Sequence, residues 1–277
     1  MASQNHSRWR LIVSLPAPGA WNMAVDEAIL EFAGRGEVEP TLRLYSWEPA
    51  CLSIGYAQPF ADVDTKQLNL KRWQVVRRPT GGRAILHIDE LTYSMIGAFS
   101  EPRLAGSVLE SYQRLSTALL IALQTLGISA QAFAKEKSST ADINPNPVCF
   151  EVPSDYEITF QGRKLIGSAQ ARRKEGVLQH GSLPLFGDLR RITQVLRYPD
   201  EDARNAAAIR LLDRAITVEG VLGHLVPWDI AARAVSEAFQ SALDIEFFQQ
   251  DLSKAEEARA QELVVEKYAS STWTNRV

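Results

Sequence analysis

Two adjacent glycines flanked by arginines form the first group of residues that could do chemistry. The segment RRPTGGRA spans residues 77–84 and is followed by His87. Adjacent glycines can adopt positive φ and bring backbone amides close to a ligand. The arginines around them could hold an anion or a polarised carbonyl. The segment matches neither a Walker A loop nor a dinucleotide-binding GxGxxG loop, and a tight turn with solvated arginines is the alternative interpretation.

A lysine followed by small residues forms the second group. The segment GRKLIGSAQ spans residues 162–170, and Lys164 opens an expected strand directly after a turn. Because Gly167, Ser168 and Ala169 are small, this strand could lie against a ligand chain. An ordinary hairpin with an exposed lysine is the alternative.

The two cysteines, Cys51 and Cys149, differ in their surroundings. Cys51 lies in the apolar segment ACLSI and is expected in the core. Cys149 ends a polar, proline-containing segment, 134–148, that predicts a long loop. A nucleophilic thiolate needs a nearby cation, and the hairpin that carries Lys164 could bring one to Cys149. On spacing alone, a buried structural cysteine remains the alternative.

Histidines offer weaker signals. His87 follows the glycine pair and His180 lies near the end of an expected strand, so each could be a buried structural histidine or a site residue. A Cys–His hydrolase stays conceivable, although its third member cannot be assigned from sequence. No CxxC pair or His/Cys cluster is present, so no metal is expected.

Composition places the chain among globular proteins. It has 277 residues, of which 45% are hydrophobic and 23% charged, and a net charge of −3. A chain of this length can bury a large core without disulfides. No apolar run reaches about 18 residues, and residues 1–10 are too polar for a secretory signal, which predicts a cytoplasmic protein without membrane contact. The absence of a basic run argues against nucleic-acid binding.

The elements that must position these groups are strands and helices in mixed order, which disfavours a doubly wound parallel sheet. Expected strands cover 9–15, 42–46, 52–56, 73–77, 84–87, 91–97, 156–160, 164–171, 176–185 and 244–248. Expected helices cover 22–32, 64–72, 108–126, 201–214, 227–243 and 252–268, with Asn22 as the first N-cap and Gly127 ending the third.

Four segments occur in one informative order: RRPTGGRAILH, NPVCFEVPSDYEI, GRKLIGSAQAR and LQHGSLPL. In this order they resemble the lipoate-protein ligase A and octanoyltransferase superfamily, and most of all its cysteine-dependent octanoyltransferase branch, known as LipM. The resemblance implies an α+β fold shared with biotin-protein ligases, with a mainly antiparallel mixed sheet flanked by helices. The length then accommodates a catalytic domain over 1–250 and a short helical extension over 251–277.

The resemblance also implies acyl transfer in two steps without a cofactor. The Cys149 thiolate would take octanoyl from octanoyl-acyl carrier protein as a thioester. A lysine of a lipoyl domain, such as the glycine cleavage H protein, would then accept it as an amide. Lys164 matches the family lysine that lowers the pKa of the cysteine, and its charge would also stabilise the developing oxyanion. A monomer is expected.

The resemblance assigns two sets of residues to substrate binding. Gly81, Gly82 and Arg83 match the acyl-pocket loop, and the strands after Lys164 line the same pocket. The predicted substrate-binding residues are Arg78, Thr80, Gly81, Gly82, Arg83, His87, Gly167, Ser168, Ala169, His180 and Gly181.

Two details separate the branches of the superfamily. Adenylating ligases resemble RRxxGGGxVxHD and have a third glycine where this chain has Arg83; they also need no cysteine nucleophile. Both features favour the transferase. One departure is that Ile88, not aspartate, follows His87. An ATP-dependent lipoate-protein ligase, an amidotransferase between lipoyl domains and a non-enzymatic acyl-carrier or lipoyl-domain binding protein remain the alternatives.

Overall fold

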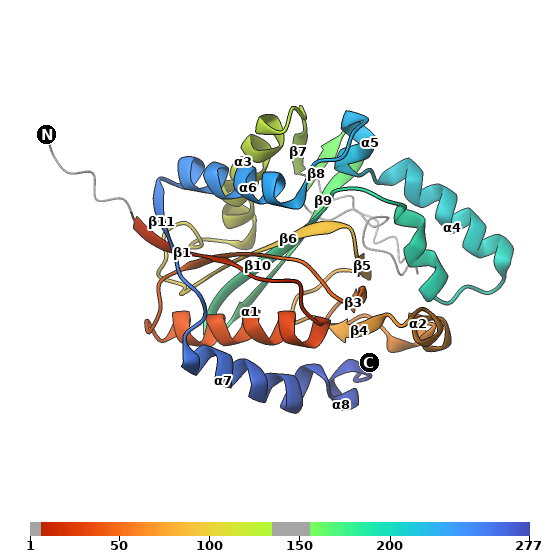
Figure 1. Cartoon of the computed structure of the whole chain (residues 1–277), viewed down its shortest axis with the longest axis horizontal. Coiled ribbons are helices and arrows are strands. Elements are labelled where there is room, and N and C mark those ends of the chain that lie inside the picture. Colours follow the sequence, from red (N-terminus) through yellow and green to blue (C-terminus); the bar gives the residue numbers. More distant parts are fainter. Residues whose placement is uncertain (1–6, 135–155) are drawn as a thin grey trace, which may run out of the picture.

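A large twisted sheet forms the centre of the computed structural model, which describes residues 7–134 and 156–277 (Figure 1). Within these residues the sheet has eight strands in the order β11-β1-β2-β6-β10-β9-β8-β7. The strands are β1 (Ser7–Val13), β2 (Thr41–Tyr45), β6 (Glu90–Gly97), β7 (Gln131–Ala134), β8 (Tyr156–Phe160), β9 (Arg163–Arg173), β10 (Gly176–Pro184) and β11 (Ile245–Gln249).

Strand β1 pairs in parallel with both β11 and β2, whereas every other neighbouring pair in this sheet is antiparallel. The predicted mixed, mainly antiparallel sheet is therefore confirmed. A smaller sheet has the order β4-β3-β5, formed by β3 (Cys51–Ile54), β4 (Gln74–Arg77) and β5 (Ile85–His87).

Helices cover both faces of the large sheet (Figure 1). One face carries α3 (Val108–Thr125) and α6 (Trp228–Leu243), and the other carries α1 (Gly19–Gly34), with α7 (Lys254–Leu263) packed against it. A capping box between Ser107 and Glu110 starts α3, and Gly127, at φ 86°, follows its end as predicted. Apolar side chains fill both interfaces, in keeping with the amphipathic patterns of α3 and α6.

Shorter elements surround the small sheet and the chain end. A third apolar cluster packs the small sheet against α2 (Thr65–Lys71) and η3 (Leu189–Val195). These elements are η1 (Phe60–Asp62), α2 (Thr65–Lys71), η3 (Leu189–Val195), α4 (Glu201–Arg214), α5 (Val218–Leu222), the π-helical turn η4 (Val264–Tyr268) and α8 (Ser271–Thr274).

The predicted role of Asn22 as an N-cap is wrong. Helix α1 already begins at Gly19, after Pro18, and Asn22 is buried inside it. Its side-chain amide donates to the carbonyl oxygens of Ala17 at 3.2 Å and Ser46 at 3.0 Å. The Asn22 side chain thus forms hydrogen bonds with carbonyl groups of segments outside the helix and does not cap the helix N-terminus.

Residues 251–277 pack closely on the rest of the fold. Arg10 in β1 donates twice to the Glu256 carboxylate of α7, and both side chains are buried. The Phe60 amide donates to the Val277 carbonyl at 2.8 Å. These contacts attach the C-terminal helices to β1 and to the segment that begins at Phe60.

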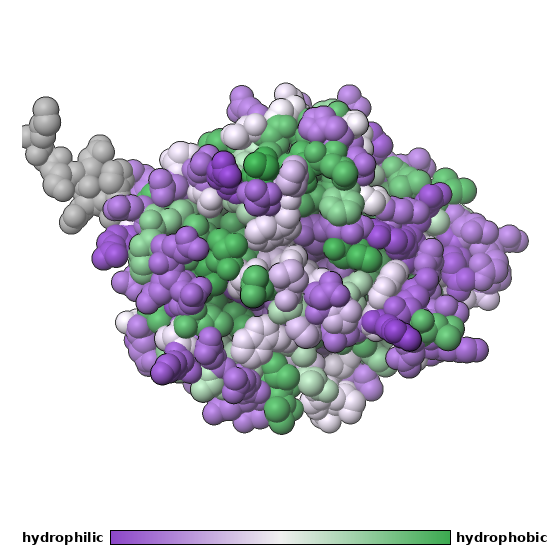
Figure 2. Space-filling view, in the orientation of Figure 1, coloured by the Kyte–Doolittle hydropathy of each residue, from purple (hydrophilic) through white to green (hydrophobic). Residues whose placement is uncertain are grey.

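The exposed surface mixes polar and apolar residues, and no continuous apolar belt crosses the face seen in Figure 2. In the part of the chain that the structure describes, no helix is long and apolar enough to cross a membrane.

Candidate active site

Two buried arginines build the loop that carries the glycine pair. Arg78 is 3% exposed and donates to the carbonyl oxygens of Ser53 at 3.2 Å, Gly81 at 2.8 Å and Arg83 at 2.7 Å. The guanidinium therefore satisfies carbonyl groups that the tight loop leaves unpaired. The alternative of a turn with solvated arginines does not hold for Arg77 or Arg78.

Arg77 fixes the neighbouring segment in the same way. Its guanidinium is fully buried and donates to the carbonyl oxygens of Gly55 at 2.8 Å, Gln58 at 2.7 Å and Thr274 at 2.7 Å. A side chain from β4 thus joins the 55–58 turn to α8.

The glycines allow a very close backbone approach. A Cβ atom added to Gly55 would lie 1.8 Å from the carbonyl oxygen of Gly82, whereas one added to Gly81 would meet no described residue within 4 Å. Gly82 itself has φ 90°, a conformation that favours glycine. Gly55 and Gly82 are therefore needed for the shape of the loop.

Thr80 connects the loop to the large sheet through a buried polar chain. Its hydroxyl lies 2.6 Å from Nε2 of His180 on β10, and Nδ1 of His180 lies 3.7 Å from the Asp26 carboxylate on α1. Burial lowers the pKa of His180, so the ring is neutral near pH 7. Burial opposes the charge of Asp26, but the ion pair with Arg43 at 2.8 Å keeps its pKa below the usual value.

His87 belongs to a second buried network, which the Ser53 hydroxyl connects to Arg78. Its ring stacks on Trp47 with a centroid distance of 3.9 Å, Nδ1 lies 2.5 Å from the Glu90 carboxylate, and Nε2 lies 2.7 Å from the Ser53 hydroxyl. These contacts place His87 beneath the loop, between the two sheets.

Small residues on β9 and β10 leave room for a polar pair. Gly181 lies opposite Ser168 in the register, and a Cβ atom on Gly181 would approach the Ser168 hydroxyl and the Tyr93 ring to 2.6 Å. The Tyr93 and Ser168 hydroxyls lie 2.7 Å apart. Gly167 and Ala169 pair with Ser182 and with His180, and strand alternation directs them to the face opposite to that of Ser168.

Lys164 lies at the start of β9, at the turn with β8. Its side chain is 3% exposed, and Nζ lies 2.9 Å from Oε1 of Glu157. Its carbonyl oxygen accepts from the Ile216 amide at 3.0 Å, which fixes the backbone at this point. Cys149, the predicted nucleophile, lies outside the described residues. Cys51 is buried in the core as predicted, and burial raises the pKa of its thiol.

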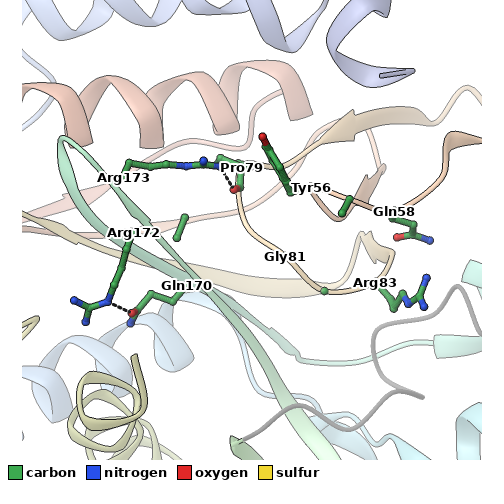
Figure 3. A pocket seen from close by; sticks show the side chains of 11 residues that line it. Tyr56, Gln58, Pro79, Gly81, Arg83, Gln170, Arg172 and Arg173 are labelled. Atoms are coloured by element: carbon green, nitrogen blue, oxygen red, sulfur yellow. Dashed lines mark hydrogen bonds between the residues drawn. The ribbon is translucent and has the colours of Figure 1, made fainter. Parts of the chain in front are cut away.

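A cavity of about 440 Å³ opens between the glycine loop and the far end of β9 (Figure 3). Of the predicted site residues, Gly81, Gly82 and Arg83 line it, whereas Arg78, Thr80 and His180 support the loop from behind. Its full lining is Tyr56, Ala57, Gln58, Pro79, Gly81, Gly82, Arg83, Gln170, Ala171, Arg172 and Arg173. No group of three or more His, Cys, Asp or Glu side chains suited to a metal occurs within the described ranges.

Comparison with known proteins gives this geometry its context. The family model described as the lipoyl protein ligase A/B catalytic domain matches residues 18–240. This chain belongs to that family. Octanoyltransferase LipM of Brevibacillus brevis is 38% identical over 97% of this chain and 99% of its own length. Octanoyltransferase LipM of Bacillus subtilis is 38% identical over 96% of this chain and 97% of its own.

Solved structures of lipoyl protein ligases have the same fold. A bipartite lipoate protein ligase from Thermoplasma acidophilum, studied with its E2 lipoyl domain, superposes with a TM-score of 0.79 at 25% identity, covering 98% of this chain and 97% of that one. A lipoate-protein ligase A bound with ATP gives 0.77 at 24% identity over 97% and 98%. The predicted superfamily, fold class and octanoyltransferase type of acyltransferase are confirmed by these matches.

Several lining residues were not predicted from the sequence. Tyr56 and Gln58 lie on the turn held by Arg77, and Arg173 extends β9 beyond the predicted end at Ala171. The signal that could have found Arg173 is the continuation of the GSAQ segment into two adjacent arginines, because strand alternation directs one of them to each face of the sheet.

Proposed function

We propose that this lipoyl protein ligase A/B family member transfers octanoyl from octanoyl-acyl carrier protein to a lysine of a lipoyl domain, such as the glycine cleavage H protein, through a thioester on Cys149. The observation that carries the proposal is the buried ammonium of Lys164 on the β8–β9 hairpin, in a chain 38% identical to octanoyltransferases over nearly its whole length.

The first step is thioester exchange. The Cys149 thiolate attacks the carbonyl carbon of the octanoyl thioester, and the carrier's thiolate leaves with the electron pair of the broken C–S bond. A cation beside the thiol favours its ionised form and stabilises the oxyanion of the tetrahedral intermediate. Lys164 supplies that cation because its backbone and ammonium are both held in place.

The second step forms an amide. The neutral amine of the acceptor lysine attacks the carbonyl carbon of the Cys149 thioester, loses a proton to water and expels the Cys149 thiolate with the electron pair of the broken C–S bond. The thiolate is then ready for the next cycle. Neither step requires ATP or a metal, since the donor already carries an activated acyl group. The glycine loop, held by Arg78, Thr80 and His180, serves as one wall of the acyl pocket in this proposal.

Intact-mass measurement after mixing the protein with octanoyl-acyl carrier protein, without ATP, tests this proposal. We expect one octanoyl adduct that hydroxylamine removes and that Cys149→Ala lacks, followed by transfer to a lipoyl domain. An adduct that persists in Cys149→Ala would overturn the covalent mechanism. Turnover that appears only with free lipoate and ATP would instead identify a ligase.

A further inference from the structure

The cavity beside the glycine loop is lined by positively charged side chains. Three arginines are among its lining residues, Arg172 and Arg173 on β9 and Arg83 across from them on the glycine loop, and no carboxylate occurs among the described residues of its wall (Figure 3). Positively charged side chains in a wall that has no carboxylate favour the binding of an anion in the cavity.

Two of the three arginines have guanidinium N–H groups that could donate to a ligand. Within residues 7–134 and 156–277, the Arg83 guanidinium makes no hydrogen bond or ion pair. Arg173 uses one N–H group for the Pro79 carbonyl at 2.8 Å, and its guanidinium lies 4.9 Å from the Tyr56 ring. A guanidinium has five N–H groups in a planar fork, so a donor pair is left for an anion.

Arg172 plays a different part. Its guanidinium donates to the Gln170 side chain at 3.0 Å and to the Leu104 carbonyl at 3.0 Å, so it is fixed in place. Burial, and after it the nearby Arg114, lower the pKa of Arg172. This end of the cavity therefore carries fixed positive charge without a matching carboxylate in its wall.

From this arrangement we infer that the cavity binds a phosphate ester of the acyl donor, namely the phosphodiester that joins a carrier protein to its thioester-bearing pantetheine arm. This inference rests on the proposed function. Arginine forks match phosphate oxygens in pairs. An octanoyl chain is a poor occupant, because burying hydrocarbon against guanidinium groups would remove their hydration without replacing it.

Size and position agree with that ligand. A cavity of about 440 Å³ is in the range of small-molecule sites. It shares Gly81 and Gly82 with the loop assigned to the acyl pocket, so an arm with its phosphate here would extend along that loop. A neighbouring cavity of about 230 Å³ shares Tyr56 and Arg173, but Glu27, Glu31 and Glu175 line it, which makes it unsuitable for an anion.

Two synthetic donors that differ only in the phosphate test the inference. We expect octanoyl-4′-phosphopantetheine to acylate the protein about tenfold faster than octanoyl-pantetheine, the ratio that one charged hydrogen bond supplies. Arg83→Gln and Arg173→Gln should bring this ratio close to one, and Arg173→Lys should keep part of it. Arg233→Gln, an exposed arginine on α6 outside the cavity lining, should keep the wild-type ratio.

The possible outcomes separate this inference from the proposed function. No octanoyl adduct with any donor, octanoyl-acyl carrier protein included, would overturn both. Adducts formed equally fast with and without phosphate would overturn the phosphate site alone. Variants of Arg83 or Arg173 that slow only the transfer to the lipoyl domain would also overturn the phosphate site. Octanoyl-coenzyme A carries the same 4′-phosphopantetheine arm. Comparing its acylation rate with that of octanoyl-acyl carrier protein shows which of the two donors the phosphate site accepts.

Discussion

The ammonium of Lys164 lies 2.9 Å from the carboxylate of Glu157, across the hairpin that joins β8 to β9. The cation proposed to activate Cys149 is therefore held by an acidic partner, and both side chains are largely buried at 3% and 18% exposure. Glu157 orients the ammonium and also offsets its charge.

Substitutions of Lys164 and of Glu157 should therefore shift the pKa of Cys149 in opposite directions. Lys164→Ala should raise the pKa of Cys149 by at least about one unit, because an adjacent cation shifts a thiol by that amount or more. Glu157→Gln should lower the same pKa, since it removes negative charge and keeps the cation. The pH dependence of iodoacetamide alkylation, followed by peptide mapping, measures both. Cys51, which is buried, provides the unreactive control.

Substitution of Gly55 should disturb the acyl-pocket loop. In Gly55→Ala the new methyl group would approach the Gly82 carbonyl oxygen to 1.8 Å, so one of the two backbones must move. We expect a higher KM for the octanoyl donor and a loss of stability of about 1–3 kcal/mol, as for other overpacking changes. Gly81→Ala is the matched control for unfolding, because its methyl group meets nothing within 4 Å in the part of the chain that the structure describes. Equal urea midpoints for the two variants would contradict the close approach.

The hydroxyl of Thr80 should matter through His180. Thr80→Val keeps the shape of the side chain but leaves Nε2 of His180 without this partner in a buried site. A buried polar group left unsatisfied costs about 1–3 kcal/mol, and the loop loses its anchor to β10. Chemical unfolding should show this loss, and donor KM should rise more than kcat falls. Thr117→Val, at an exposed site on α3, should leave both stability and kinetics unchanged.

Acid should weaken the attachment of α7. Burial opposes ionisation of Glu256, but hydrogen bonds from Arg10 and Ser253 outweigh it and hold its pKa below the usual value. Because the folded-state pKa is depressed, the stabilisation is present above the ordinary glutamate pKa of about 4.3 and is lost as the pH falls through the folded value.

Glu256→Gln should therefore flatten the fall in unfolding free energy below about pH 4.3. At pH 7 it should cost about 3 kcal/mol, since it leaves the buried Arg10 unpaired. Urea unfolding at several pH values measures both effects. Glu262→Gln removes a carboxylate that is 59% exposed and pairs with Arg259, and it should change stability by less than about 1 kcal/mol. An equal cost for both substitutions would show that burial of the Arg10 pair is unimportant.

Elements with a clear period were predictable from the sequence. The apolar spacing of α3 and α6 and the alternation of β6, β9 and β10 gave their positions to within a few residues. Cys51 was recognisable as core because its neighbours are apolar. Local patterns of this kind depend only on residues close in the chain.

Contacts between distant segments were not predictable from these patterns. Nothing near Arg77 in the sequence shows that its guanidinium meets the Thr274 carbonyl, and nothing near Asp26 indicates His180. Short elements such as α5 and β7 were missed because four or five residues carry too little periodicity. The motif order indicated which residues belong to the site, but the arginine-walled cavity depends on how the 55–58 turn meets β9.

The parallel pairing of β1 with β11 has a consequence for biosynthesis. Residues 7–11 find their partners only at residues 245–249, so one edge of β1 stays unpaired until almost the whole chain has left the ribosome. At about 5–20 residues per second, that delay is on the order of tens of seconds. An open strand edge is a template for pairing with other chains, so this protein should depend on chaperones or low concentration mainly while the chain is incomplete.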